Sequence, residues 1–101
     1  MRIVWSPRAI KHLTALRAYI EADNAQAAAA VVSKIVDSVD LLVDQPHSGR
    51  PGRLPGTREL VVPGTPYVIP YRLRAGRLEL IAVFHGKQKW PKRSNRMRRA
   101  L

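Results

Sequence analysis

The sequence predicts a small α+β domain in which an N-terminal helical hairpin packs on one face of a small antiparallel β-sheet. Between residues 7 and 45 the apolar residues recur at spacings of three and four, which is typical of amphipathic helices. From residue 58 onward the period changes to two, which is typical of strands. A segment rich in proline and glycine, residues 46–56, separates the two regions, and a chain of 101 residues has the length of one domain.

The chain begins with a short strand that leads directly into the first helix. Residues 2–5 form a β-type run that stops at Ser6 and Pro7, where serine can cap a helix and proline suits its first position. An apolar stripe then extends along about four turns. It consists of Ala9, Leu13, Leu16 and Ile20.

A second helix follows after a short break at Asp23 and Asn24, which can cap it. Its apolar stripe consists of Ala28, Val32, Ile35, Val39 and Leu42. Pro46 ends this helix, and the short connection predicts that the two helices lie antiparallel as a hairpin. Three acidic residues, Asp37, Asp40 and Asp44, are expected to face water rather than to bind a metal ion.

Three strands are expected after the loop at 46–56. Residues 58–62 form the first, a turn follows at 63–66, and residues 67–74 and 77–85 form a hairpin around Ala75 and Gly76. A two-residue loop predicts the pairs Arg74 with Arg77, Leu73 with Leu78, Tyr71 with Leu80, Ile69 with Ala82, and Tyr67 with Phe84. The last four pairs share one face of the hairpin, and all their members are apolar or aromatic. This face is therefore predicted to pack on the core.

The opposite face of the predicted hairpin mixes charged and apolar side chains. Arg72, Arg74, Arg77 and Glu79 lie at its turn end, Val68, Pro70, Ile81 and Val83 lie in its middle, and His85 lies at its far end. Adjacent apolar residues at the surface predict a face that a partner covers, or that a third layer of the same chain covers. Pro70 has no N–H for the ladder, which predicts a bulge or an edge position there.

The charge of the chain is concentrated in its C-terminal half. Residues 1–45 carry five basic and five acidic residues, so the whole net charge of +11 comes from residues 46–101. The last part, residues 92–101, is a basic tail that follows Trp90 and Pro91. A charge so unevenly distributed indicates an anionic partner, such as nucleic acid or an acidic protein segment, although solubility alone is the alternative.

The residue types exclude several kinds of chemistry. The chain has no cysteine, its three histidines lack paired metal-ligand spacing, and it has no Gly-x-Ser-x-Gly elbow. Metal-free RNA cleavage remains, in which a general acid or base acts beside phosphate-stabilising cations. His85 is the candidate acid or base, unless it merely ends a strand. The candidate stabilising cations are Arg58, Arg72, Arg74, Lys87 and Lys89.

Four segments in a fixed order carry a resemblance to a known family. They are Gly-Arg-Pro-Gly-Arg at 49–53, Gly-Thr-Arg-Glu-Leu-Val-Val at 56–62, Pro-Tyr-Val-Ile-Pro-Tyr-Arg at 66–72 and Phe-His-Gly-Lys-Gln-Lys-Trp-Pro at 84–91. With the order of expected elements, they resemble the RelE/ParE toxin superfamily over residues 1–91. The resemblance implies the toxin of a bacterial type II toxin–antitoxin pair. Its cognate antitoxin would be a small protein that wraps the toxin and folds as it binds, and operator DNA would be contacted only through that antitoxin.

The superfamily contains ribosome-dependent mRNA endonucleases, such as RelE and YoeB, and ParE-like toxins that act on DNA gyrase. By the resemblance, Val68 stands where RelE-like nucleases carry a catalytic arginine, Gly52 stands near the YoeB-like glutamate, and Gln88 stands near a terminal arginine. Only His85 aligns with a nuclease residue. The resemblance therefore favours inhibition of gyrase. The alternatives are an mRNA endonuclease using His85, Arg72, Arg74 and Lys87, and a non-toxic basic module that binds nucleic acid.

These interpretations predict two sets of binding residues. Target or nucleic-acid contacts are expected at Arg50, Arg53, Arg58, Lys87, Lys89, Trp90, Lys92 and Arg93. Antitoxin contacts are expected at Val68, Pro70, Arg72, Arg74, Ile81 and Val83. No metal site, cofactor, membrane segment or targeting segment is expected, and the cysteine-free composition favours the cytoplasm.

Overall fold

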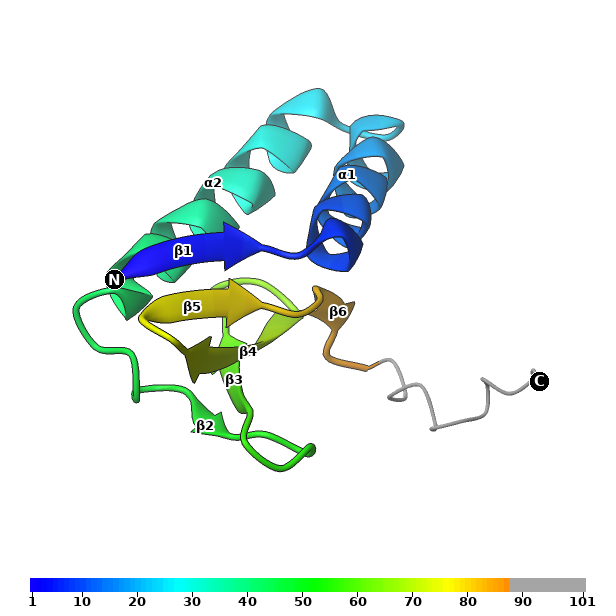
Figure 1. Ribbon diagram of the computed structural model, residues 1–101. Coiled ribbons are helices and arrows are strands. Elements are labelled where there is room, and N and C mark those ends of the chain that lie inside the picture. The colour runs from blue at the N-terminus through cyan, green and yellow to red at the C-terminus, as the bar shows by residue number, and fades with distance from the viewer. Residues whose placement is uncertain (88–101) are drawn as a thin grey trace.

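The computed structural model describes residues 1–87, in which a hairpin of two helices packs on one face of a six-stranded sheet (Figure 1). The helices are α1, Pro7–Glu21, and α2, Ala25–Leu42. The strands are β1 (Arg2–Trp5), β2 (Arg50–Pro51), β3 (Arg58–Val61), β4 (Tyr67–Arg74), β5 (Arg77–Leu80) and β6 (Phe84–His85). The order in the sheet is β1-β5-β4-β3-β2, and β6 also pairs with β4. The predicted α+β class and the predicted helical hairpin are confirmed.

Side-chain caps fix the start of each helix. Ser6 Oγ accepts a hydrogen bond from the Ala9 N–H at 3.0 Å, and Asn24 Oδ1 accepts one from the Ala27 N–H at 3.0 Å. These bonds satisfy backbone donors that a helix leaves unpaired in its first turn. The connection between α1 and α2 is the part of the hairpin farthest from the sheet (Figure 1).

The sheet is mixed rather than purely antiparallel, which corrects the sequence-based expectation. The first strand, β1, pairs in parallel with β5, with Arg2 opposite Arg77 and Trp5 opposite Leu80. Sequence periodicity can identify β1 as a strand, but its partner lies more than 70 residues away and no local pattern specifies the direction of pairing. A second difference is β2, a two-residue strand at Arg50–Pro51 inside the segment expected to be a loop.

The core lies between α2 and the helix-facing side of the sheet. Its buried members come from both layers: Ala9, Ile35, Val39, Leu42, Val62, Ile69, Tyr71, Leu78, Leu80 and Val83. The two helices contribute unequally, because Ala9 is the only buried residue of α1, whereas α2 buries Ala28 and three larger residues. Leu13 and Leu16 of α1 are half-buried, so part of the predicted apolar stripe remains at the surface.

The central hairpin keeps the predicted register near its turn and departs from it farther along. Tyr71 pairs with Leu80 and Arg74 pairs with Arg77, as the two-residue loop predicts. The Ile81 N–H still donates to the Pro70 carbonyl at 2.9 Å, but Val68 then pairs with Phe84. Two residues, Ala82 and Val83, therefore lie opposite Ile69 alone.

This arrangement is a β-bulge. The sequence predicts a bulge or an edge position at Pro70 itself, whereas the bulge lies on the partner strand, opposite the neighbouring Ile69. The continuous strand predicted at 77–85 is divided into β5 and β6. The predicted pair of Tyr67 with Phe84 is wrong, because Tyr67 pairs with His85. Since side chains alternate between faces, the one extra residue shifts the pairing of β6 with β4 by one position and brings His85 opposite Tyr67.

Candidate functional site

An apolar groove lies between α1 and the strands β4 and β6. Its volume is 590 Å³, and its lining residues are His12, Ala15, Leu16, Tyr19, Tyr67, Val83, Phe84 and His85. Two ring contacts run along it: His12 lies 5.4 Å from Phe84, and Tyr67 meets His85 edge-on at 5.7 Å, both measured between ring centroids. Tyr19 is 83% exposed at its outer end. We call this surface the aromatic groove.

His12 joins the groove to the bulge. Its Nδ1 accepts a hydrogen bond from the Val83 N–H at 3.1 Å, while Ser6 Oγ donates to the Ile81 carbonyl at 2.8 Å. These side chains of α1 and its cap thus bind backbone groups in the segment where the ladder is interrupted. Burial lowers the pKa of His12, and the nearby cations Arg8 and Lys11 lower it further. A neutral imidazole is therefore the favoured form in the groove.

His85 lies in the aromatic groove and not on the face that carries the arginines, which corrects its predicted position. Its neighbour across the ladder is Tyr67, a side chain that packs against the core, and its Nδ1 accepts a hydrogen bond from the Lys87 N–H at 3.1 Å. The physical reason is the bulge, since the predicted register without it would place His85 on the opposite face.

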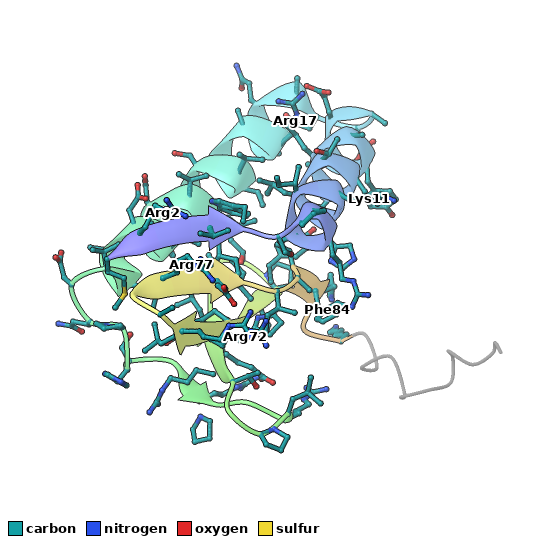
Figure 2. The ribbon with its side chains drawn as sticks, viewed as in Figure 1. Arg2, Lys11, Arg17, Arg72, Arg77 and Phe84 are labelled. Atoms are coloured by element: carbon teal, nitrogen blue, oxygen red, sulfur yellow. The ribbon has the colours of Figure 1, made fainter. Side chains whose placement is uncertain are left out.

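The opposite face of the sheet carries a row of three arginines. Arg2 on β1 lies opposite Arg77 on β5, and Arg77 lies opposite Arg74 on β4, so all three side chains project from the same face. The next row contains Glu79 and Arg72, which are also cross-strand partners. Figure 2 labels Arg2, Arg77 and Arg72 on these three neighbouring strands. We call Arg2, Arg72, Arg74 and Arg77, with Glu79 among them, the arginine platform.

Glu79 is the common partner of three of these arginines. Its carboxylate lies 2.8 Å from Arg72 Nε, 3.2 Å from Arg77 Nη2 and 3.6 Å from Arg74 Nη2. The hydrogen bond from Arg72 is the main cause that holds the pKa of Glu79 below its usual value, and the charge of Arg74 adds to this effect. The platform thus contains four guanidinium groups and one carboxylate, so it keeps a clear excess of positive charge.

A second glutamate on the same face has a different role. Glu59 on β3 is only 2% exposed, and its Oε1 accepts hydrogen bonds from Arg50 Nε and Nη2 at 3.1 and 3.0 Å. Its Oε2 accepts from the Arg53 backbone N–H at 3.2 Å and lies 3.7 Å from Arg53 Nε. Both oxygens therefore hold the loop around β2 against the sheet.

Arg58, another predicted target residue, is occupied by the backbone of the preceding loop. Its Nη1 donates to the carbonyls of His47 and Gly49, at 3.1 and 3.0 Å. The Tyr71 hydroxyl binds the same loop, accepting from the Gly49 N–H at 2.9 Å and donating to the Pro46 carbonyl at 2.8 Å. A Cβ on residue 49 would lie 2.5 Å from that hydroxyl, so glycine is required there for steric reasons.

The apolar face predicted to await a partner is largely buried within the chain. Val68, Pro70 and Val83 are buried, and Ile81 is half-buried. The bulge turns Val83 into the core, and the backbone at Gly86 folds back over Val68, where its N–H binds the Pro66 carbonyl. The expectation of an exposed apolar patch at these positions is wrong. Arg72 and Arg74 are the members of the predicted antitoxin set that remain well exposed.

The structure separates the residues predicted to act together in a nuclease. His85 and Arg72 lie on opposite faces, and the partner of His85, Tyr67, lies about 17 Å from Arg72 along β4 at 3.4 Å per residue. Lys87 is exposed just beyond β6. Lys89, Trp90, Lys92, Arg93 and the tail at 92–101 lie outside the described residues.

Sequence reasoning missed two members of each surface. Arg2 and Arg77 were not assigned to any binding set, although the predicted pair of Arg74 with Arg77 already placed two guanidinium groups side by side. His12 and Phe84 of the groove gave no sequence signal, because their contact depends on how α1 crosses the bulge. Within residues 1–87 there is no group of three or more potential metal ligands, and no helix has the length and apolar composition to cross a membrane.

Comparison with known proteins identifies the family. Residues 3–90 match the model of the family described as "ParE toxin of type II toxin-antitoxin system, parDE". The chain belongs to the ParE toxin family. It is therefore the toxin of a type II toxin–antitoxin system, and the ParDE organisation of the family implies an antitoxin partner.

Similar proteins agree with this assignment. A protein of Sinorhizobium fredii named "Putative toxin Y4kP" is 49% identical over 90 residues, which cover 89% of this chain and 93% of that protein. "Toxin RelE2" of Caulobacter vibrioides is 32% identical over 84 residues, which cover 83% and 93%. A solved structure of the "Chromosomal ParDE TA system from P. aeruginosa" matches this ParE-family fold with a TM-score of 0.75 and 26% identity, over 84% of this chain and 95% of that one.

Proposed function

We propose that this ParE-family toxin arrests growth by binding DNA gyrase without catalysing a reaction, and that a small cognate antitoxin neutralises it. The separation of His85 from the arginine platform carries the first part of the proposal. Cleavage of RNA without a metal needs a proton-transfer group and cations at the same phosphate. Here the histidine and the platform lie on opposite faces, so no single phosphate group can contact both.

The aromatic groove is the surface proposed for the antitoxin. It is concave and apolar, and it presents two side chains of α1, the half-buried Leu16 and the exposed Tyr19. A segment that folds on binding can bury such a surface with its own apolar side chains. Arg72 and Arg74, which were also predicted to contact the antitoxin, lie on the opposite face of the sheet and do not line this groove.

A direct test of the target combines supercoiling assays with labelling of cells. Purified toxin is expected to inhibit DNA supercoiling by gyrase, and thymidine incorporation is expected to fall before methionine incorporation after induction. The variant His85→Ala, shown to be folded by circular dichroism, should remain toxic. Early loss of methionine incorporation, with mRNA cut on the ribosome, would instead support the nuclease alternative. This alternative is tested because one relative is named Toxin RelE2.

The groove can be tested separately from the target. Tyr19→Glu changes an exposed side chain at the rim of the groove, so the variant should fold, remain toxic and resist neutralisation by the antitoxin. Ile10→Glu is the matched control, because Ile10 is also exposed on α1 but does not line the groove. Equal neutralisation of both variants would exclude the groove as the antitoxin site.

A further inference from the structure

The row formed by Arg2, Arg77 and Arg74 is unfavourable for folding. Like charges directly opposite each other on neighbouring strands destabilise a sheet. Strands lie about 4.8 Å apart, so the three arginine side chains leave the sheet side by side within about 10 Å. Glu79 in the next row compensates only in part, and the Arg2 side chain forms no ion pair with any residue from 1 to 87.

The guanidinium groups keep donors that the fold does not use. Each guanidinium group carries five N–H donors, whereas Glu79 offers two oxygens to Arg72, Arg74 and Arg77 together. The side chain of Arg74 is 58% exposed. Glu79 thus holds the arginines in place and leaves most of their donors directed to solvent, as in a preformed anion site.

We propose that the arginine platform binds the phosphate backbone of duplex DNA, so that the toxin contacts DNA directly as well as through its antitoxin. Guanidinium groups on adjacent strands can each bind a phosphate with paired N–H bonds, which lysines cannot do. The choice of duplex DNA rests on the proposed function, since gyrase brings the toxin next to this polymer.

Other features of the face favour a duplex over the alternatives. Single-stranded nucleic acid is usually held by exposed aromatic side chains on which bases stack, and the strands that carry the platform, β1, β4 and β5, present none on this face. An acidic peptide would need apolar anchors, but Val68 and Pro70 beside the platform are buried. The face therefore fits a ligand recognised by its regular negative charge alone.

The test measures the binding of a short fluorescent DNA duplex to the full-length toxin at several salt concentrations, with no gyrase present. Replacing Arg2, Arg74 and Arg77 by glutamine should lower the slope of log K against log salt by up to about 2.7, at about 0.9 per phosphate contact. If the two proteins bind equally at 1 M salt, this slope difference corresponds to a loss of affinity of about 500-fold at 0.1 M salt. Glu79→Gln should have the opposite effect and strengthen binding.

The control triple variant removes Arg8, Lys11 and Arg17 from α1, which lies on the other side of the sheet and carries the labelled Lys11 and Arg17 (Figure 2). It lowers the net charge from +11 to +8, as the platform variant does. The control should lose clearly less affinity. Equal losses in the two variants would overturn the proposal, because they would show that only net charge matters.

Two further measurements complete the test. The single variant Arg2→Gln loses no ion pair of the described chain, so it should fold normally and still lower the salt slope by about 0.9. A polyglutamate peptide that binds as tightly as DNA, and loses affinity in the platform variant, would assign the surface to an acidic protein and overturn the proposal. Gyrase inhibition is scored separately, so a toxin that binds DNA but spares gyrase would refute the proposed target and not the platform.

Discussion

The two faces of the β-sheet differ in how far the hydrogen-bonding groups of their side chains are used within the fold. On the helix side, the side chains of Ser6 and His12 form hydrogen bonds with backbone groups of the bulge. The Tyr71 hydroxyl likewise binds backbone groups of the loop at Pro46 and Gly49. On the other side, the arginine platform has more donors than the fold can use. These polar groups of the helix side stabilise the fold, and on the other side Glu59 does so as well, whereas the guanidinium groups of the arginine platform keep N–H donors available to a ligand.

The bulge at Ala82 and Val83 decides which residues belong to which face. Without it, His85 would lie beyond the arginines and Val83 would project from their face. With it, Val83 enters the core and His85 joins the aromatic groove. One extra residue in a strand therefore separates the apolar surface of this toxin from its charged surface.

The sharpest test of this comparison is the stability of variants on each face. Leu80→Ala removes a fully buried side chain from the helix side and should lower the free energy of unfolding by about 2–5 kcal/mol. Arg74→Gln removes an exposed cation from the other side and should change it by no more than about 0.5 kcal/mol. Urea unfolding measures both. A larger loss from Arg74→Gln than from Leu80→Ala would contradict the division between the two faces.

An intermediate loss of stability is expected from removing the Tyr71 hydroxyl, which binds the loop that precedes Arg50. Tyr71→Phe keeps the buried ring but leaves the Gly49 N–H and the Pro46 carbonyl without the hydroxyl. A buried donor or acceptor without a partner costs about 1–3 kcal/mol, so unfolding should require less urea. Tyr67→Phe is the control, since no hydrogen bond of the Tyr67 hydroxyl is found within residues 1–87. Equal losses in the two variants would show that the hydroxyl of Tyr71 does not hold the loop.

Much of this fold could be predicted because its signals are local. Ser6 and Asn24 cap the helices where short-range patterns place them, and the two-residue turn fixes the pairs from Arg74–Arg77 to Tyr71–Leu80. Pro70, which lacks an N–H, predicted a bulge or an edge position, and the partner strand contains a bulge one residue away. Its consequence for His85 could not be derived, because the exact position of the bulge depends on Ser6 and His12, which lie more than 70 residues away in sequence. The parallel pairing of β1, which adds Arg2 to the platform, is long-range for the same reason.

Glu79 should make a smaller contribution to stability, and this contribution should depend on pH. The pKa of this carboxylate in the folded toxin is held below its ordinary value of 4.5, mainly by the hydrogen bond from Arg72. The unfolded chain therefore takes up the proton first as the pH falls, and the stabilisation by Glu79 is lost below about pH 4.5. The stability difference between wild type and Glu79→Gln should be present at pH 7 and shrink toward pH 3. A difference that stays constant with pH would mean that Glu79 is not a charged partner of the platform.

The smallest expected effect lies in the aromatic groove, where stability should also decrease as the pH falls, but over a higher pH range. Burial lowers the pKa of His12 from 6.5, and Arg8 and Lys11 lower it further, so the folded toxin favours the neutral ring while the unfolded chain takes up a proton more readily. The stabilisation by neutral His12 is complete above pH 6.5 and is lost as the pH falls through the lowered value. Wild type should therefore lose stability between pH 7.5 and 5 relative to His12→Gln, whose amide can accept the Val83 N–H without taking up a proton. A stability difference that does not change over this range would show that the bond to Val83 does not depend on a neutral imidazole, and that protonation in the groove leaves the bulge in place.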